Sequence, residues 1–300
     1  MLEKAVVECV PNFSEGRDRD RIQAIAEAIA SVEGVALLDV DAGADTNRTV
    51  YTFAGGPRAV VEAALAGARR ARDLIDMRNH SGSHPRMGAL DVCPFVPIAG
   101  ISMAECAQLA RDFGARLARE FSIPVFLYEE AAAKPSRRSL ADIRFGEYEG
   151  LAAKLADPEW HPDFGPSRFD PRWGATVVGA REALLAFNVN LTTEDVGVAK
   201  EIASELRESG KIVRNSRGVP ELDHLGQVKR IQGRLKAVRA IGWQVRELRC
   251  TQVSMNILNF RTTALWMAFE AVREAAERRG FGVSGRSEER RVGKECRSRG

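Results

Sequence analysis

One order of secondary structure occurs twice along the chain, and this repeat constrains the fold more than any other feature. In the N-terminal part, hydrophobic periodicity and turn residues predict a strand, a helix, two strands and a second helix. These elements are expected at residues 5–10, 17–31, 35–41, 46–54 and 57–76. The first helix has the clearest pattern, because Ile22, Ile25 and Ile29 recur at spacings of three and four residues.

The same order returns near the C-terminal end. Its elements are expected at residues 186–191, 193–210, 235–243, 251–258 and 263–279, with Thr192 or Thr193 as the cap of the first helix. Two copies of one order, each with a sheet that needs a partner surface, predict an α/β (α+β) protein of two similar ferredoxin-like subdomains. We expect these subdomains to pack face to face, with the ligand site in the cleft between them.

The segment between the two copies extends the first subdomain. It reads as a strand at 89–98, a helix at 102–121 and a buried strand at 123–128. Residues 157–174, with the sequence DPEWHPDFGPSRFDPRWG, are too rich in proline and glycine for a regular element. A long irregular loop in a compact protein is usually a linker or functional. The expected boundaries are 1–180 and 181–285 for the two subdomains and 286–300 for a tail.

Charge and composition exclude several functional classes. The net charge of +3 resides in residues 286–300, which carry six basic and three acidic side chains, so the remainder is formally neutral. A basic tail without aromatic residues is typical of a disordered end, and we expect no nucleic-acid partner. The five cysteines are widely spaced, without a C-x-x-C pair, and no apolar run approaches the roughly 20 residues of a membrane span. We therefore expect a cytoplasmic protein that is neither secreted nor embedded in a membrane.

The segment from Asp76 to Asp91, with the sequence DMRNHSGSHPRMGALD, is the most informative for chemistry. It holds His80 and His84, two of the four histidines, in a loop interrupted by glycine and proline. Histidine exchanges protons near neutral pH, which suits a general acid or base, but both rings could equally hold the loop by bonding its backbone. The pattern alone does not distinguish these roles or the two residues.

Binding of a metal or a nucleotide is not expected. His-x-x-x-His is a zinc signature on a helix, but Gly82 and Pro85 argue against helical geometry and no third ligand lies nearby. The sequence contains neither a G-x-G-x-x-G motif after a strand nor a G-x-x-x-x-G-K-[ST] motif, and it lacks the G-x-S-x-G motif of serine hydrolases.

A second group of charged residues surrounds the turn from Asp39 to Arg48. Asp41 is a candidate for orienting a histidine or holding a substrate amine, and Arg48 for binding a carboxylate. The alternative is a hairpin turn stabilised by Asp and Asn side chains, which explains Asp45 and Asn47 better than these two residues. Arg86, two residues after His84, is a further candidate for carboxylate binding, although a lone arginine in a loop more often forms a surface ion pair.

Four motifs resemble those of the glutamate formimidoyltransferase family. They read VECVPNFSEG at 7–16, NRTVYTF at 47–53, HPRMGALDVCPF at 84–95 and QVSMN at 252–256. The resemblance runs in order from about residue 6 to about residue 282. It implies two similar α/β subdomains, the first of them catalytic, whose sheets face each other across a substrate tunnel.

The resemblance also implies a reaction. Members of this family transfer the formimino group from N-formimino-L-glutamate to N5 of tetrahydrofolate in histidine degradation, and they are typically homodimers. The catalytic histidine of the family matches His84 rather than His80, and we expect it to protonate the departing glutamate nitrogen. The family's folate-binding segment matches Gly165, Pro166, Ser167, Arg168, Phe169, Asp170, Pro171, Arg172, Trp173 and Gly174. Within it, Phe169 or Trp173 could stack on the pterin, and Arg168 or Arg172 could meet the glutamyl tail.

The chain departs from the family pattern at its C-terminal end. Where the family continues into an apolar strand, this chain turns into the basic tail, so we expect the last strand of the second subdomain to be lost. No cyclodeaminase segment is present in this sequence. Rival functions are formyl transfer from N-formylglutamate, processing of 5-formyltetrahydrofolate, and folate binding without catalysis.

Overall fold

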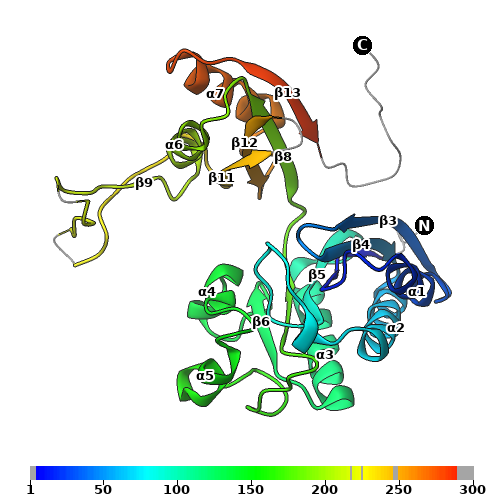
Figure 1. The fold of residues 1–300 in the computed structure, drawn as a ribbon. Coiled ribbons are helices and arrows are strands. Elements are labelled where there is room, and N and C mark those ends of the chain that lie inside the picture. Colours follow the sequence, from blue (N-terminus) through cyan, green and yellow to red (C-terminus); the bar gives the residue numbers. More distant parts are fainter. Residues whose placement is uncertain (1–4, 217, 224–225, 246–248, 289–300) are drawn as a thin grey trace. The chain divides into compact units, whose positions relative to one another are not determined.

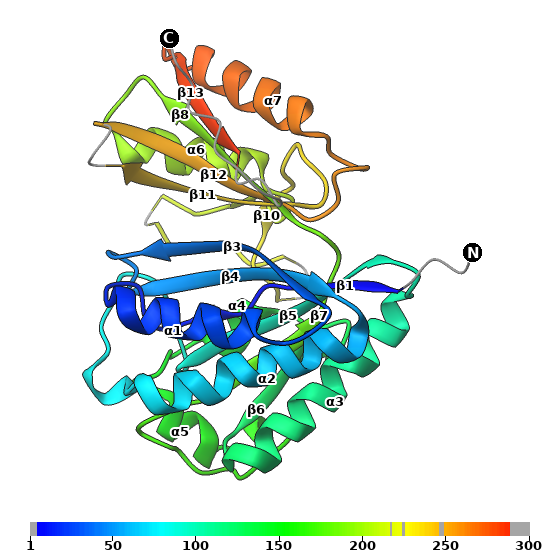
Figure 2. The same ribbon diagram turned by 90° about the vertical axis from the view of Figure 1, so that its right-hand side faces the viewer.

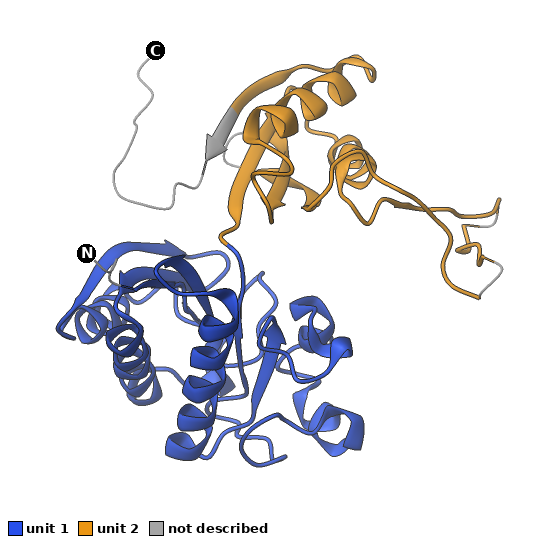
Figure 3. Cartoon of the chain, turned by 180° about the vertical axis from the view of Figure 1, so that it is seen from behind, with its two compact units in different colours: residues 1–182, 292–300 blue, residues 183–291 orange. Residues whose placement is uncertain are grey.

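The chain folds into two compact units that divide between Glu182 and Ala183, close to the boundary expected at residue 180 (Figures 1 and 3). The computed structural model describes residues 5–216, 218–223, 226–245 and 249–288. Within these residues, no helix is both long and apolar enough to cross a membrane.

Unit 1 begins with the predicted order of elements. These are β1 (Val6–Cys9), β2 (Asn12–Phe13), α1 (Arg19–Ala30), β3 (Val35–Gly43), β4 (Arg48–Gly55), α2 (Pro57–Leu74) and β5 (Leu90–Ala99). β1 and β2 both pair with β4 on one side and β5 on the other, and β3 pairs with the far edge of β4. All of these pairings are antiparallel, so the first part of unit 1 has the split β-α-β arrangement of a ferredoxin-like fold.

The rest of unit 1 extends this sheet. It contains α3 (Met103–Phe121), β6 (Val125–Glu129), α4 (Leu140–Arg144), α5 (Leu151–Ala156), β7 (Thr176–Ala180) and the short 3-10 turns η1 (Met77–Asn79), η2 (Pro135–Arg137) and η3 (Pro158–Trp160). β7 inserts between β5 and β6, parallel to both. β7, α4 and α5 are not predicted from the sequence, because elements of five or six residues are too short to show a clear period.

Two hydrophobic clusters flank the extended sheet of unit 1. Val125 and Leu127 of β6 belong to the larger cluster, with residues of α1, α2 and α3, whereas Phe126 and Tyr128 belong to a second cluster, with residues of α4 and α5. This alternation is the two-residue period of a strand buried on both faces. Figure 2 shows α2 and α3 side by side along the sheet.

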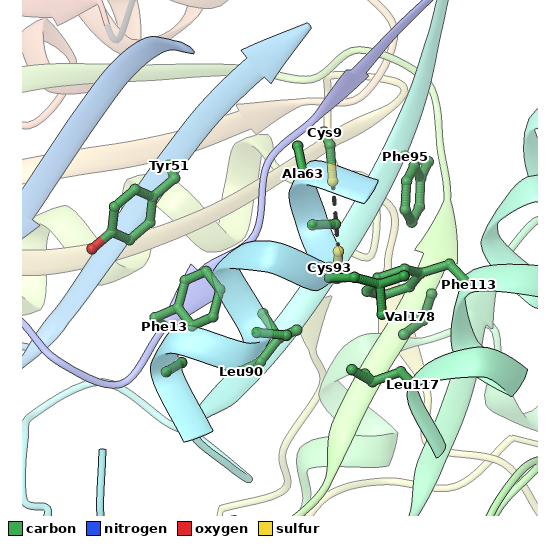
Figure 4. Packing of buried hydrophobic residues seen from close by; sticks show 14 of the residues in the cluster. Cys9, Phe13, Tyr51, Ala63, Leu90, Cys93, Phe95, Phe113, Leu117 and Val178 are labelled. Atoms are coloured by element: carbon green, nitrogen blue, oxygen red, sulfur yellow. Dashed lines mark hydrogen bonds between the residues drawn. The ribbon is translucent and has the colours of Figure 1, made fainter. Parts of the chain in front are cut away.

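Free cysteines lie inside the larger cluster. Cys9 and Cys93, on adjacent strands, bring their sulfur atoms to 3.5 Å among the aromatic rings of Phe95 and Phe113 (Figure 4). Every cysteine in the described ranges is buried and without a disulfide bond. These side chains act there as small apolar groups.

Unit 2 repeats the ferredoxin-like topology. Its elements are β8 (Leu185–Leu191), α6 (Val196–Leu206), β11 (Val238–Val245), β12 (Cys250–Ile257), α7 (Leu265–Glu277) and β13 (Val283–Glu288), with β9 (Lys211–Ile212) and β10 (Arg230–Ile231) pairing in a separate two-stranded sheet. The order β11-β12-β8-β13 is antiparallel throughout and matches β3-β4-β1-β5 of unit 1. The prediction of two similar α/β subdomains is thus confirmed, while the facing sheets and the tunnel stay predictions.

The expected loss of the last strand is wrong. β13 pairs with β8 from Val283 to Glu288, so residues 286–288, which we assigned to the tail, belong to the sheet. A ladder requires only an extended backbone, whereas the sequence analysis looked for apolar side chains. The remaining tail, residues 289–300, lies outside the described residues. The cap of α6 also differs, because Asp195 rather than Thr192 or Thr193 accepts the backbone N–H of Gly197.

Candidate active site around His84

The loop between α2 and β5 places its two histidines in different surroundings. Both ring nitrogens of His80 are engaged: Nε2 lies 2.7 Å from the Asn47 carbonyl oxygen and Nδ1 lies 3.3 Å from Nε of Arg86. Because a carbonyl only accepts and an arginine only donates, His80 donates through Nε2 and accepts through Nδ1. Burial lowers the pKa of His80. This ring connects the loop to the turn before β4 and has no nitrogen left for a substrate.

Among the described residues, only one ring nitrogen of His84 has a hydrogen-bond partner. Nδ1 lies 2.7 Å from the carbonyl oxygen of Pro85 and must donate to it, so in the neutral ring Nε2 carries the free electron pair. Burial, followed by the positive charge of Arg48, lowers the pKa of His84 from 6.5 to about 4. Without substrate, His84 is therefore neutral at pH 7, and it must first accept a proton before it can act as the donor that we expected.

A buried ion cluster lies beside His84. Asp91 of β5 is fully buried, and its Oδ2 accepts hydrogen bonds from Arg48 and, at 2.5 Å, from Arg144. Its Oδ1 accepts the backbone N–H of Met87 at 2.8 Å. Burial would raise the pKa of Asp91, but the charges of Arg144 and Arg48 outweigh burial and hold it below its ordinary value. Two guanidinium groups on one carboxylate leave a net positive charge.

Arg86 stabilises the histidine loop through contacts within the chain. Its side chain is only 8% exposed and forms a two-bond ion pair with Glu149, at 2.6 and 2.8 Å. Its remaining N–H groups reach the ring and the carbonyl of His80 and, at 3.4 Å, the carboxylate of Glu147. All five donors of the guanidinium are thus in use. The carboxylate that Arg86 binds is in the chain itself, which argues against our prediction that it binds a substrate.

A pocket of about 730 Å³ opens beside this loop, entirely within unit 1. Its lining comes from the histidine loop and from the segment that contains α4: Ser81, Gly82, Pro85, Arg86, Ala141, Arg144, Phe145, Gly146, Glu147 and Glu149. Pro85, which accepts the hydrogen bond from His84, and Arg144, whose charge acts on His84, both line it. A volume of this size can hold a metabolite or part of a larger ligand.

The segment from Gly165 to Gly174 lies against the histidine loop. Gly174 pairs with Gly88, the Ala89 N–H donates to the Trp173 carbonyl at 2.8 Å, and the Met77 N–H donates to the Arg172 carbonyl at 3.0 Å. Gly165 and Gly174 both have φ above +80°, a region that suits glycine. Residues about 85 positions apart in the sequence are therefore neighbours.

Trp173 cannot stack on a pterin, which corrects one alternative from the sequence. Its side chain is fully buried, packs against Phe121 at a ring distance of 5.3 Å and donates from Nε1 to Thr176 at 3.0 Å. Phe169 is only partly buried, and its ring centre lies 5.3 Å from that of Tyr148. Of the two aromatic candidates, Phe169 alone is accessible to a ligand.

The other members of this segment have structural or exposed positions. Arg172 donates to the carbonyls of Arg72 and Asp73 near the end of α2, while Arg168 is exposed. Asp170 forms an ion pair with Arg72 at 2.8 Å, and the Ser167 hydroxyl donates to the Leu155 carbonyl at 2.7 Å. Arg168 is therefore better placed than Arg172 to meet an anionic ligand.

Asp41 is not brought to the histidines by a bond. It lies on β3 opposite Val50, and partial burial together with the nearby charge of Asp39 raises its pKa. Among the described residues, Asp41 makes no hydrogen bond or ion pair with His80 or His84, and no group of three or more His, Cys, Asp or Glu side chains is arranged to hold a metal.

The sequence analysis missed Arg144, Tyr148 and Glu149 and gave no role to Asp91. Arg144 ends a helix of five residues in a chain with many arginines, so nothing local marks it. The one local indication is of the helix and not of Arg144 itself: Ser139 caps α4 by accepting the N–H of Asp142, so the run from Ser139 to Asp142 could have predicted a helix start there.

Comparison with known proteins agrees with this arrangement. Residues 6–181 match the model of the formiminotransferase domain, N-terminal subdomain, and residues 186–288 match the model of the formiminotransferase domain. The formimidoyltransferase-cyclodeaminase of Rattus norvegicus is 54% identical over 280 residues, which cover 93% of this chain and 49% of that protein. This chain thus spans about half the length of the first such relatives.

Two shorter relatives match along most of their own length. The glutamate formimidoyltransferase of Streptococcus pyogenes serotype M1 is 40% identical over 280 residues, covering 93% of this chain and 86% of the relative. That of Thermoplasma acidophilum is 43% identical over 278 residues, covering 92% and 84%. Two matched domain models and relatives of this identity show that the chain belongs to the formiminotransferase family.

Proposed function

We propose that this protein transfers the formimino group from N-formimino-L-glutamate to N5 of tetrahydrofolate, giving 5-formiminotetrahydrofolate and L-glutamate. The observation that carries the proposal is the Nε2 of His84, which has no hydrogen-bond partner among the described residues and lies beside a buried cationic cluster whose Arg144 lines a pocket. The names of the relatives, glutamate formimidoyltransferase and formimidoyltransferase-cyclodeaminase, support the same reaction.

In this proposal His84 carries one proton between two nitrogens. N5 of tetrahydrofolate attacks the amidine carbon, and the new N5–C bond leaves a positive charge on N5. Nε2 of His84 accepts the N5 proton and then donates it to the glutamate nitrogen, so that the old C–N bond breaks and glutamate leaves as an amine. Proton transfer of this kind contributes about 100- to 10,000-fold in rate, and the alignment of the two substrates supplies the rest.

Tetrahydrofolate is proposed as the co-substrate, bound along Gly165–Gly174. Phe169, backed by Tyr148, is the aromatic side chain that could stack on the pterin, and Arg168 is the exposed cation for the glutamyl tail. The close pairing of this segment with the histidine loop supports the proposal, since it would bring N5 toward His84.

The setting of the reaction also remains a proposal. We expect a cytoplasmic homodimer, and the reduced cysteines of both units fit a reducing compartment. Asp41 stays a candidate for a contact with substrate, because it lies on the same sheet as Arg48 with a raised pKa.

The test is an assay of two donors side by side. Purified protein is incubated with tetrahydrofolate and either N-formimino-L-glutamate or N-formyl-L-glutamate, and the folate product is identified by mass spectrometry. We expect turnover with the formimino donor. Turnover with the formyl donor alone would replace this substrate assignment, and folate binding without any turnover would favour a non-catalytic protein.

A further inference from the structure

The buried cluster of Arg48, Asp91 and Arg144 has more positive than negative charge. Asp91 is fully buried, and a single one of its oxygens receives both arginines. The side chains of Arg48 and Arg144 are 10% and 13% exposed, so water screens the excess charge weakly. An anion bound next to the cluster would neutralise it.

Arg144 has hydrogen-bonding capacity left over. Its Nε is buried and makes no hydrogen bond with the described part of the chain. Native proteins satisfy nearly all buried polar groups, so this orphaned donor marks an incompletely bonded side chain. Nε is covered, so a ligand would reach the terminal nitrogens, of which Nη2 alone has a partner, Asp91, among the described residues. The other arginine of this pocket, Arg86, has all its donors in use. Arg144 is therefore the cation in the lining that can still bind a ligand.

The chemistry of the site selects a carboxylate. A guanidinium presents parallel N–H groups that match the two oxygens of a carboxylate. Both substrates of the proposed reaction carry such groups: the donor has an α- and a γ-carboxylate, and the folate has a glutamyl tail. In the donor, the α-carboxylate is attached to the same carbon as the reacting nitrogen. In the folate, an aminobenzoyl group separates the tail from N5.

The position of the cluster relative to His84 distinguishes between the carboxylates of the donor and of the folate. Pro85, whose carbonyl accepts the hydrogen bond from His84, lines the same pocket as Arg144, and Met87 of the same loop donates to Asp91 at 2.8 Å, so the cluster lies next to the acid/base residue. Resting on the proposed function, we propose that Arg144, supported by Arg48, binds the α-carboxylate of the glutamate donor and so positions its nitrogen at His84. Arg144 is then a substrate-binding residue, and Asp91 positions both arginines from behind.

This arrangement has a consequence for proton transfer. The charged groups that face His84 are Arg48 from β4, Asp91 from β5 and Arg144 from α4, and the Pro85 carbonyl accepts from its ring. A carboxylate on Arg144 offsets the positive charge that adds to the effect of burial on His84, so we expect donor binding to raise the pKa of His84 above its value without ligand. The ring can then hold the proton that it passes to the leaving nitrogen.

The test compares ligands that differ in one carboxylate. Binding of L-glutamate, L-glutamine and L-isoglutamine to the full chain is measured by calorimetry with wild-type protein, Arg144→Gln and Arg144→Lys. L-isoglutamine lacks the α-carboxylate, and L-glutamine lacks the γ-carboxylate. We expect Arg144→Gln to weaken the binding of L-glutamate and of L-glutamine by about 10- to 100-fold. Arg144→Lys should weaken it less, because an ammonium retains the positive charge but lacks the paired N–H groups of a guanidinium. L-isoglutamine should bind wild type and Arg144→Gln equally.

A matched control and two further readouts keep the outcome clear. Arg138→Gln removes a nearby arginine that is half exposed and paired with Glu130, and it should leave all three affinities unchanged. Arg144→Gln should retain the wild-type affinity for tetrahydrofolate with one or several glutamyl residues. In wild-type protein, NMR titration of the His84 ring should show a higher pKa when L-glutamate is bound, a measurement that needs no variant.

Two results would overturn the inference: an Arg144→Gln protein with wild-type affinity for L-glutamate, or a His84 pKa that L-glutamate does not change. Loss of folate affinity in Arg144→Gln would assign the residue to the folate tail instead. Failure of the proposed function can be distinguished from failure of this inference. In that case wild-type protein would bind L-glutamate through Arg144 without transferring a formimino group to tetrahydrofolate.

Discussion

Gly174 packs so closely on Met87 that a Cβ atom on it would lie 2.1 Å from the Met87 carbonyl oxygen. This contact joins the proposed folate-binding segment to the loop that carries His84. Gly280 offers a matched comparison, because its φ of +79° is nearly the same as the +81° of Gly174, while in the described part of the chain no heavy atom beyond its two chain neighbours lies within 4 Å of the added Cβ.

We predict that Gly174→Ala is far more destabilising than Gly280→Ala. The positive φ alone costs about 1 to 2 kcal/mol in each variant, and the collision with backbone adds to this cost only at position 174. Thermal and urea unfolding of both variants measure the difference. Equal losses of stability would show that the 165–174 segment and the histidine loop are less closely packed than the structure indicates.

Replacing His84 should impair chemistry, whereas replacing His80 should loosen the loop. His84→Ala is expected to lower kcat by about 100- to 10,000-fold and to leave folate binding measurable. His80→Ala should reduce kcat less, because its ring bonds the Asn47 carbonyl and Arg86 rather than a substrate. Steady-state kinetics and folate titration of both variants provide the measurements, and unchanged activity in His84→Ala would sink the mechanism.

Stability should decrease between neutral and acidic pH because of the histidine loop. The folded-state pKa of His84, about 4, is below its ordinary value of 6.5, and that of His80 is lowered too. The unfolded chain therefore binds more protons in this range, so the contribution of His84 is complete above about pH 6.5 and is lost as the pH falls to about 4. Urea unfolding as a function of pH should show this trend in wild type and a weaker one in His84→Gln.

The Arg86–Glu149 pair should contribute modestly to stability and mainly fix the loop. The two bonds are short, but the Glu149 side chain is 64% exposed, so a double-mutant cycle with Arg86→Gln and Glu149→Gln should give a coupling of about 1 kcal/mol or less. Arg86 holds the pKa of Glu149 below its ordinary value of 4.5, so this coupling is present above that pH and is lost as the pH falls through the folded-state pKa. A coupling that survives full protonation of Glu149 would contradict this account.

The aromatic residues of the 165–174 segment should separate into one ligand contact and one core residue. Phe169→Ala is expected to weaken tetrahydrofolate binding by roughly 3- to 10-fold, the value of one aromatic stacking contact. Trp173→Phe should change folate affinity little but lower the unfolding free energy by about 1 to 3 kcal/mol, because the Thr176 hydroxyl loses its buried partner. Isothermal titration and denaturant unfolding test both variants, and the reverse pattern would place the pterin on Trp173.

The sequence alone determined the repeated architecture, since hydrophobic period, turn residues and helix caps are local properties. The helices predicted at 17–31, 57–76, 102–121 and 263–279 agree with α1, α2, α3 and α7. The reliance on local patterns also explains why three elements were not predicted: α4 and α5 are too short to show a hydrophobic period, and β13 lacks an apolar sequence pattern.

Only the tertiary structure decided what the site residues do. Loop chemistry could not separate His80 from His84, because the difference lies in distant partners: the His80 ring contacts the Asn47 carbonyl and Arg86, whereas the His84 ring donates to the adjacent Pro85 carbonyl. Trp173 is a candidate for stacking in the sequence, but the structure buries it against Phe121 of α3. Arg144 becomes a candidate site residue only through its ion pair with Asp91, 53 positions earlier in the chain. Charge, burial and free hydrogen-bond donors depend on contacts between distant segments, and a single sequence does not contain those contacts.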